Sequence, residues 1–307
     1  MEYNQFKGIF PPVVTLFTST KEFDKKGMGL LIDSLIDKEV DGLVFLGSTG
    51  EFSQMSISQR KEVAEFCINY VNQRVPVLIG TGSTNTAEAI SLSQHADSNG
   101  ADGVIVVNPY YWKITKENLF HYYNNIARSI NIPLLLYNIP SLTGQNIGID
   151  TIFKLVQTNN NIAGIKVSVD SINYIGDIIL EVKEKFPYFI VLTGQDSHLF
   201  NTIFLGGDGG VPGTANFVPQ LSVNLLQSYK KGDLEKSKKI QKKIIEITKI
   251  YKQDPSLFIP IKEAIYFCGL NISQQVLPPN QMLNRESKKV IEKHLSNVLF
   301  SSDCKDI

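Results

Sequence analysis

Short apolar runs rich in β-branched residues alternate with amphipathic segments from the N-terminus to about residue 230. Runs of this length, apolar on both faces and bounded by Gly, Pro or Asn, are typical of strands buried in a parallel sheet. We expect eight strands, at 8–17, 42–46, 76–80, 103–107, 133–137, 162–167, 189–193 and 209–211.

The segments between these runs carry apolar residues at helical spacing. The clearest stripe runs from Val63 to Val71, and Ser56 with Gln59 forms a capping-box start before it. Helices are expected at 27–40, 56–73, 85–99, 115–130, 149–158, 172–185, 196–205 and 218–231.

Eight strand–helix units predict an α/β fold of the (β/α)8 TIM-barrel type over residues 1–232. An open doubly wound sheet is the alternative, but Gly80-Thr81-Gly82 lacks the third glycine of a dinucleotide fingerprint. Residues 233–307 show only helical patterns and predict a C-terminal helical extension packed on the barrel. We interpret the lysine-rich face around Ile240 and Ile244 as the solvated side of a packed helix.

Composition excludes several classes of protein. Thirty basic and thirty acidic residues balance, which gives no indication of nucleic acid or an anionic membrane as a partner. Cys67, Cys268 and Cys304 are odd in number and widely spaced, which indicates reduced thiols rather than a disulfide framework. No apolar stretch resembles a signal peptide or a membrane span, so we expect a cytoplasmic protein.

Lys166 lies inside the apolar run that forms the sixth expected strand. Lysine is rarely buried without a partner, and burial favours the uncharged amine that a nucleophilic, Schiff-base-forming lysine requires. The alternative is a lysine at a strand end whose amine reaches water.

Polar residues at two other strand ends favour the catalytic interpretation. Ser48, Thr49 and Gly50 follow the second strand, where hydroxyls, backbone N–H groups and close backbone approach suit a small carboxylate. An ordinary turn is the alternative. Tyr137 ends the fifth strand and would point its phenol into the barrel mouth.

Lysine, phenol and carboxylate cradle together predict an imine-forming aldolase acting on a 2-keto acid. The lysine would attack the ketone, the protonated imine would accept electrons, and the tyrosine would relay protons. No other cofactor is expected. No metal is expected either, because the four scattered histidines lack metal-ligand spacing.

Three motifs carry a resemblance to a known family: Gly-Ser-Thr-Gly-Glu at 47–51, Tyr-Asn-Ile-Pro-Ser-Leu-Thr-Gly at 137–144 and Gly-Ile-Lys at 164–166. From about Phe6 to Pro279 the chain resembles the dihydrodipicolinate synthase/N-acetylneuraminate lyase family of pyruvate-dependent class I aldolases. The resemblance implies a barrel with a C-terminal helical extension and a homotetramer built as a dimer of dimers.

The same resemblance implies roles for individual residues. Lys166 would be the Schiff-base lysine and Tyr137 the proton relay, while Ser48 and Thr49 would hold the pyruvyl carboxylate. Tyr110 looks like the tyrosine that some members lend to a neighbouring subunit, with interface packing alone as the alternative. The remaining candidates for substrate contact are Ser168, Gly194, Asp196, Ser197 and Val211.

Differences between members of the family narrow the predicted activity of this chain. Leu142 stands where lysine-biosynthesis synthases carry an arginine, and Ser197 stands where sialic acid lyases carry a glutamate after Asp196. Longer stretches resemble bacterial 2-keto-3-deoxygluconate and 2-keto-3-deoxypentonate aldolases, although Val167, Thr49 and Gln195 depart from their pattern.

We therefore expect cleavage of a 2-keto-3-deoxy sugar acid to pyruvate and a short aldehyde. The alternatives are N-acetylneuraminate lyase, 4-hydroxy-tetrahydrodipicolinate synthase, a dehydratase of the same family, and a sugar-acid-binding regulator without turnover.

Overall fold

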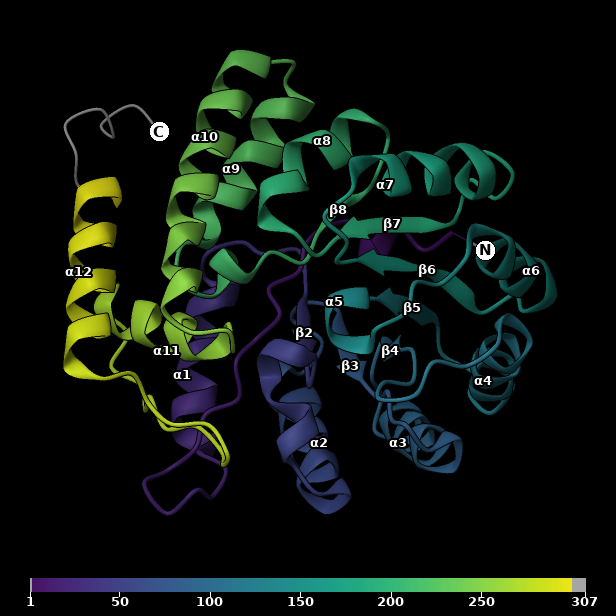
Figure 1. Ribbon diagram of the computed structural model, residues 1–307, viewed down its shortest axis with the longest axis horizontal. Coiled ribbons are helices and arrows are strands. Elements are labelled where there is room, and N and C mark those ends of the chain that lie inside the picture. The colour runs from purple at the N-terminus through teal and green to yellow at the C-terminus, as the bar shows by residue number, and fades with distance from the viewer. Residues whose placement is uncertain (1, 300–307) are drawn as a thin grey trace.

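The computed structural model describes residues 2–299, and its centre is one sheet of eight parallel strands (Figure 1). Neighbouring strands follow the order β1-β8-β7-β6-β5-β4-β3-β2. Their bounds are β1 (Gly8–Ile9), β2 (Leu43–Phe45), β3 (Val77–Gly80), β4 (Gly103–Val107), β5 (Leu134–Asn138), β6 (Ile162–Val167), β7 (Ile190–Thr193) and β8 (Gly209–Gly210).

The sheet closes on itself between its first and second strands. β1 pairs with β8, and just beyond β1 the Val13 N–H donates to the Val44 carbonyl at 2.8 Å while the Val44 N–H donates to the Pro11 carbonyl at 3.0 Å. This closure confirms the predicted barrel rather than an open doubly wound sheet. The strand predicted over 8–17 was too long, because Pro11 and Pro12 have no N–H to continue a ladder.

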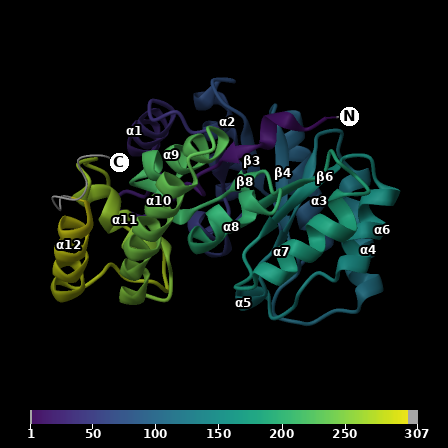
Figure 2. The same ribbon diagram turned by 90° about the horizontal axis from the view of Figure 1, so that it is seen from above.

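Helices surround the strands, as two views at right angles show (Figures 1 and 2). The predicted capping box at the start of α2 is confirmed. The Ser56 hydroxyl accepts from the Gln59 N–H, and the Gln59 Oε1 accepts from the Ser56 N–H. Around the barrel lie α1 (Lys25–Ile36), α2 (Ile57–Val71), α3 (Thr86–Ser98), α4 (Lys116–Arg128), α5 (Pro140–Thr143), α6 (Ile149–Thr158), α7 (Ile172–Ile178), α8 (Leu199–Phe204) and α9 (Pro219–Lys230).

Two helical details differ from the prediction. The short helix α5, which follows β5, was not predicted because its four residues are too few to show a period. The helix predicted over 172–185 is α7 followed by a π-helical turn, Ile179–Lys183. The other predicted helices agree with the structure to within a few residues at each end.

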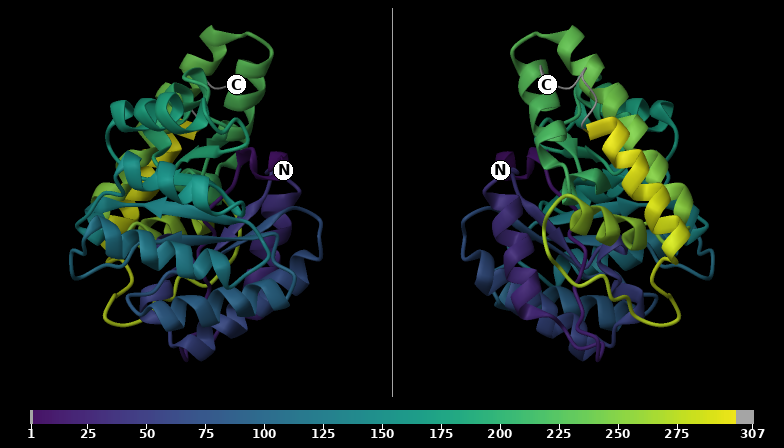
Figure 3. Two further views of the ribbon diagram at one scale, coloured as in Figure 1. Left: turned by 90° about the vertical axis from the view of Figure 1, so that its right-hand side faces the viewer. Right: turned by 90° about the vertical axis from the view of Figure 1, so that its left-hand side faces the viewer.

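Three more helices follow the barrel in the chain: α10 (Leu234–Ile247), α11 (Phe258–Phe267) and α12 (Arg285–Leu299). They lie together at one side of the barrel (Figures 1 and 3). Ile240, Ile244 and Ile247 on α10 are wholly buried, which confirms the predicted apolar face. Within residues 2–299 no helix has both the length and the apolar character needed to cross a membrane.

Candidate active site

Lys166 and Tyr137 lie side by side near the C-terminal ends of β6 and β5. They are register partners in the parallel pairing of these strands. Both are buried, at 3% and 4% exposed respectively. The Lys166 Nζ lies 4.1 Å from the centre of the Tyr137 ring. The barrel thus places the amine and the phenol together at the end where barrel enzymes carry their chemistry.

The Lys166 amine is held without a carboxylate. None of the ion pairs between residues 2–299 includes Lys166. Its neighbour is instead Tyr137: the amine lies against the face of the ring and forms a hydrogen bond with the phenol. Such an amine is able to attack a carbonyl carbon.

The phenol of Tyr137 is polarised by its surroundings. Burial alone would raise its pKa, but the charge of Lys166 and hydrogen bonds with Ser48, Ser168 and Lys166 outweigh burial and lower the pKa. The Ser48 Oγ lies 3.4 Å from the Tyr137 oxygen. A phenol with a lowered pKa gives up its proton more readily, which suits a proton relay.

A one-turn 3₁₀ helix, Ser48–Gly50, follows β2 and carries the predicted carboxylate cradle. Ser48 and Thr49 are half-buried and Gly50 is buried. Within residues 2–299, neither the Ser48 nor the Thr49 backbone N–H donates a hydrogen bond to another group. Two free N–H groups beside two hydroxyls form a concave donor site that suits a carboxylate.

Lys166 and Tyr137 line one narrow pocket inside the barrel. Its other walls are apolar side chains and glycines from the ends of the first strands: Val44, Leu46, Gly47, Phe52, Gly80, Gly82, Ile105 and Val107. Such walls exclude water and leave the amine and the phenol as its polar groups. Among residues 2–299 there is no cluster of three or more His, Cys, Asp or Glu side chains that could hold a metal ion.

Gly194 provides room for the site by having no side chain. A Cβ at this position would lie 2.0 Å from the Ser168 Oγ and 2.9 Å from the Lys166 Cε. Ser168 itself is buried and bonds to the Tyr137 hydroxyl. Gly194 and Ser168 therefore belong to the surroundings of the lysine and the phenol.

The carboxylate of Asp196 is turned toward the loop after β8. Its oxygens accept from the Gly213 N–H at 3.1 Å, from the Thr214 N–H at 2.9 Å and from the Thr214 hydroxyl at 2.5 Å. Burial raises the pKa of Asp196. These hydrogen bonds favour a role of Asp196 in holding the loop, rather than the predicted contact with substrate hydroxyls. Of the other distal candidates, Ser197 is half-buried and Val211 is a buried apolar residue after β8.

The predicted intersubunit tyrosine, Tyr110, packs within its own chain. Its ring is half-buried and makes an edge contact with Phe52 at a centroid distance of 6.2 Å. The next residue, Tyr111, is the one that projects outward. It is 86% exposed, has a left-handed backbone with φ of 82°, and lies beside Trp112, which is 75% exposed. The role of Tyr110 at the site of a neighbouring subunit therefore stays a prediction.

Sequence reasoning missed a buried ion pair between Glu51 and Lys262 next to the cradle. A signal was present, since Lys262 lies in an apolar segment, Phe258–Ala264, as Lys166 does in its strand. His198 lies at the same end of the barrel as the site, and its Nε2 is 3.0 Å from the Asp170 Oδ1.

Residues 5–298 match the profile of the Dihydrodipicolinate synthetase family. The chain belongs to this family. The resemblance predicted from the three motifs is thereby confirmed over nearly the whole chain.

Two relatives from Escherichia coli carry provisional names as aldolases of keto-deoxy sugar acids. The 2-dehydro-3-deoxy-D-gluconate aldolase YagE is 48% identical over 92% of this chain and 94% of its own length. The 2-dehydro-3-deoxy-D-pentonate aldolase YjhH is 44% identical over 92% of this chain and 94% of its own length. The predicted resemblance to these two kinds of aldolase is confirmed.

Solved structures of related proteins share the fold of this chain. The crystal structure of YagE in complex with pyruvate superposes with a TM-score of 0.95, at 46% identity, over 96% of this chain and 99% of that one. Dihydrodipicolinate synthase from Aquifex aeolicus superposes with a TM-score of 0.90, at 30% identity, over 95% of this chain and 98% of that one.

Proposed function

We propose that this protein is a class I aldolase that cleaves a 2-keto-3-deoxy sugar acid to pyruvate and a short aldehyde. The observation that carries the proposal is the buried Lys166 amine, which has no carboxylate partner among residues 2–299 and lies against the Tyr137 ring. The names of the two E. coli relatives, which refer to six-carbon and five-carbon keto-deoxy acids, support this substrate class.

In the proposed reaction the neutral Lys166 Nζ attacks the C2 carbonyl of the substrate. Tyr137 gives its proton to the departing hydroxyl, so that water leaves and a protonated imine forms beside the Tyr137 phenolate. Tyr137 takes the proton of the C4 hydroxyl as the C3–C4 bond breaks, and the bonding electrons move into the imine to give an enamine. The aldehyde departs. Protonation of the enamine at C3 and hydrolysis of the imine then release pyruvate and restore the amine.

The proposed carboxylate cradle explains how the keto carbon meets the amine. Ser48 and Thr49 supply hydroxyls and free backbone N–H groups to the substrate carboxylate, and Ser48 also lies next to the Tyr137 oxygen. The protonated imine itself accepts the electrons, so the proposed chemistry uses no further cofactor. Free thiols at Cys67 and Cys268 suit the reducing cytoplasm, while Cys304 lies outside the described residues.

The test is a panel of 2-keto-3-deoxy acids of five and six carbons, with pyruvate release coupled to a dehydrogenase. We expect pyruvate from at least one member, together with glycolaldehyde from a five-carbon or glyceraldehyde from a six-carbon acid. A 2-oxo acid product without pyruvate would instead identify a dehydratase. Release of N-acetylmannosamine from sialic acid would identify a sialic acid lyase.

We also propose a homotetramer built as a dimer of dimers, because two separate apolar groups are exposed. Tyr111 and Trp112 form one at the catalytic end of the barrel. Phe204 and Leu205, at the end of α8, form the other. Exposed aromatic side chains are typical of interaction surfaces, and two such groups suit two kinds of subunit contact.

Replacing Tyr111 and Trp112 together by alanine should weaken one of these contacts, because aromatic side chains contribute strongly to interfaces. Light scattering during size-exclusion chromatography should show a lower mass than for the wild type at the same concentration. Tyr266→Ala, which removes an exposed ring on α11, is the control and should leave the mass unchanged. An unchanged mass for the Tyr111/Trp112 variant would refute the role of this aromatic pair.

A further inference from the structure

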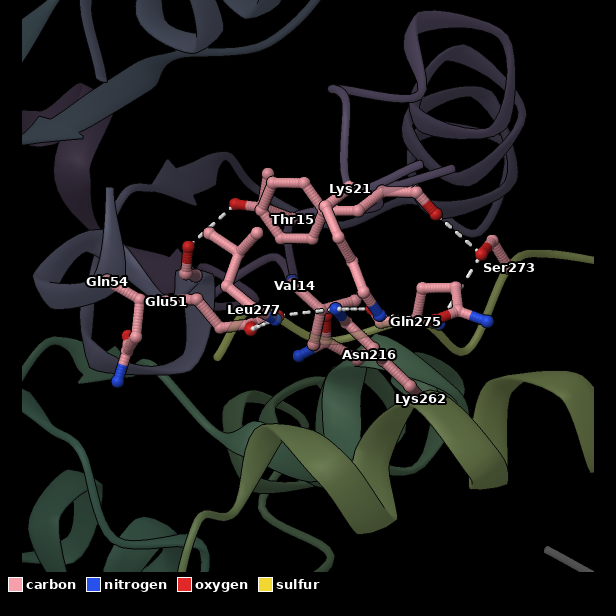
Figure 4. A network of polar contacts seen from close by, with 12 residues as sticks. Val14, Thr15, Lys21, Glu51, Gln54, Asn216, Lys262, Ser273, Gln275 and Leu277 are labelled. Atoms are coloured by element: carbon pink, nitrogen blue, oxygen red, sulfur yellow. Dashed lines mark hydrogen bonds and ion pairs between the residues drawn. The ribbon is translucent and has the colours of Figure 1, made fainter. Parts of the chain in front are cut away.

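A buried ion pair connects the C-terminal extension to the carboxylate cradle. Glu51 directly follows the Ser48–Gly50 turn, and Lys262 lies on α11, 211 residues further along the chain. Both side chains are 0% exposed, and the Lys262 Nζ contacts the Glu51 Oε1. Figure 4 shows Lys262 reaching from α11 to Glu51 and to the segment that contains Gln275.

The pair is also tied to a second segment of the extension, the one that contains Gln275 and Leu277. The Lys262 Nζ donates to the Gln275 carbonyl at 2.7 Å, and the Leu277 N–H donates to the Glu51 Oε2 at 2.9 Å. Each oxygen of the Glu51 carboxylate thus accepts a hydrogen bond from the extension. A carboxylate held on both oxygens fixes the backbone that carries it.

Folding stability does not account for this arrangement. Burial raises the pKa of Glu51 and lowers the pKa of Lys262 to about 8, because desolvation outweighs the mutual attraction of the two groups. By linkage, each charged form is less favourable in the folded chain than in the unfolded chain. A buried pair of this kind is weak evidence for stability, and its value lies in fixing geometry.

The cradle is a segment whose backbone needs such fixing. Leu46 before it and Glu51 after it are both left-handed, with φ of 56° and 59°, a conformation that residues other than glycine rarely adopt. Strained residues keep their conformation only where the surrounding contacts hold them. The Thr15 hydroxyl donates to the Gly50 carbonyl at 2.7 Å, and the Glu51–Lys262 pair holds the far side of the turn.

We propose that Glu51 and Lys262 are positioning residues that hold the Ser48–Gly50 turn in the conformation that receives the substrate carboxylate. The C-terminal extension is then part of the site although none of its residues needs to touch the substrate. This inference rests on the proposed function, because it concerns the carboxylate of a 2-keto acid bound next to Lys166.

The test measures how the pyruvate concentration affects imine formation, with borohydride trapping the imine and intact-protein mass reporting the adduct. In Lys262→Met the buried Glu51 carboxylate loses its partner, so the turn should move. We expect the half-saturating pyruvate concentration to rise at least about tenfold, which is about 1.4 kcal/mol of binding. The adduct at saturating pyruvate should persist, because Lys166 is intact.

Lys183→Met is the matched control. Lys183 also forms an ion pair, a partly buried one with Asp208, and donates to the Phe189 carbonyl at 2.9 Å. Asp208 precedes β8, so this pair lies at the opposite end of the barrel from the cradle. Its loss should lower the melting temperature and leave the half-saturating pyruvate concentration unchanged.

Glu51→Gln provides a milder variant in case Lys262→Met does not fold. It keeps the shape of the side chain and an acceptor for the Leu277 N–H, and it should raise the half-saturating concentration by a smaller factor. An unchanged value in every folded variant of the pair, or an equal rise in Lys183→Met, overturns the inference. A wild type that forms no adduct overturns the proposed function instead, so the two failures are distinguishable.

Discussion

Replacing Lys166 by methionine should abolish aldol cleavage, lowering kcat/KM by at least about 10,000-fold, or roughly 5 kcal/mol of transition-state stabilisation. The reason is that every later step of the proposed reaction needs the covalent imine, and among the described residues 2–299 no other amine lines the pocket. Methionine keeps most of the length of the side chain, so the packing against the Tyr137 ring is largely preserved. The loss should therefore concern chemistry and not folding.

Two measurements check this expectation: pyruvate release from the best acid of the panel, and mass after treatment with pyruvate and borohydride. The Lys166→Met protein should show neither product nor adduct, with an unchanged circular dichroism spectrum. Lys154→Met is the control, because the Lys154 Nζ also lies over a ring, that of Phe120, at 4.5 Å, but on the outer helices. A pyruvate adduct that survives in Lys166→Met would mean that another residue is the nucleophile.

The barrel could be predicted from the sequence because its signal is repeated. Each buried strand gives a short β-branched run, and each covering helix gives a stripe at helical spacing, so eight weak signals support one another. The boundaries were harder to predict, since they depend on backbone hydrogen bonds between distant segments. The first strand is the clearest case, because Pro11 and Pro12 end its ladder inside an apolar run.

The catalytic pair could be predicted for a different reason. Parallel strands of a barrel bring their C-terminal ends together, so residues far apart in the sequence converge when each ends a strand. Tyr137 and Lys166 follow this rule and are register partners. Roles that depend on direction could not be predicted in the same way. Asp196 turns toward a loop, and the left-handed Tyr111 projects outward while Tyr110 packs against Phe52.

The Glu51–Lys262 pair shows where such reasoning stops. Its partners are 211 residues apart, and one of them belongs to a helix outside the barrel repeat. Neither a strand-end rule nor a periodicity connects them. Only the packing of α11 against the catalytic end of the barrel brings the lysine to the carboxylate.

Tyr137→Phe should lower the rate of aldol cleavage by about 100- to 1000-fold while imine formation with pyruvate persists. The variant keeps the ring that the Lys166 amine rests on and removes only the hydroxyl that bonds to Ser48 and Ser168. Without this hydroxyl the C4 proton has no acceptor in the pocket. The nucleophile and the carboxylate cradle remain.

The contrast between the two variants separates imine formation from proton transfer. Borohydride trapping should give an adduct in Tyr137→Phe and none in Lys166→Met, whereas pyruvate release from the sugar acid should be low in both. Tyr3→Phe is the control, because it also removes the phenol hydroxyl of a buried tyrosine. This hydroxyl donates to the Asn160 carbonyl at 2.7 Å, before β6 and thus at the opposite end of the barrel. This control should lower stability slightly and leave kcat unchanged. If Tyr137→Phe cleaves the sugar acid at the wild-type rate, the proton of the C4 hydroxyl leaves by another route and the phenol only orients the amine.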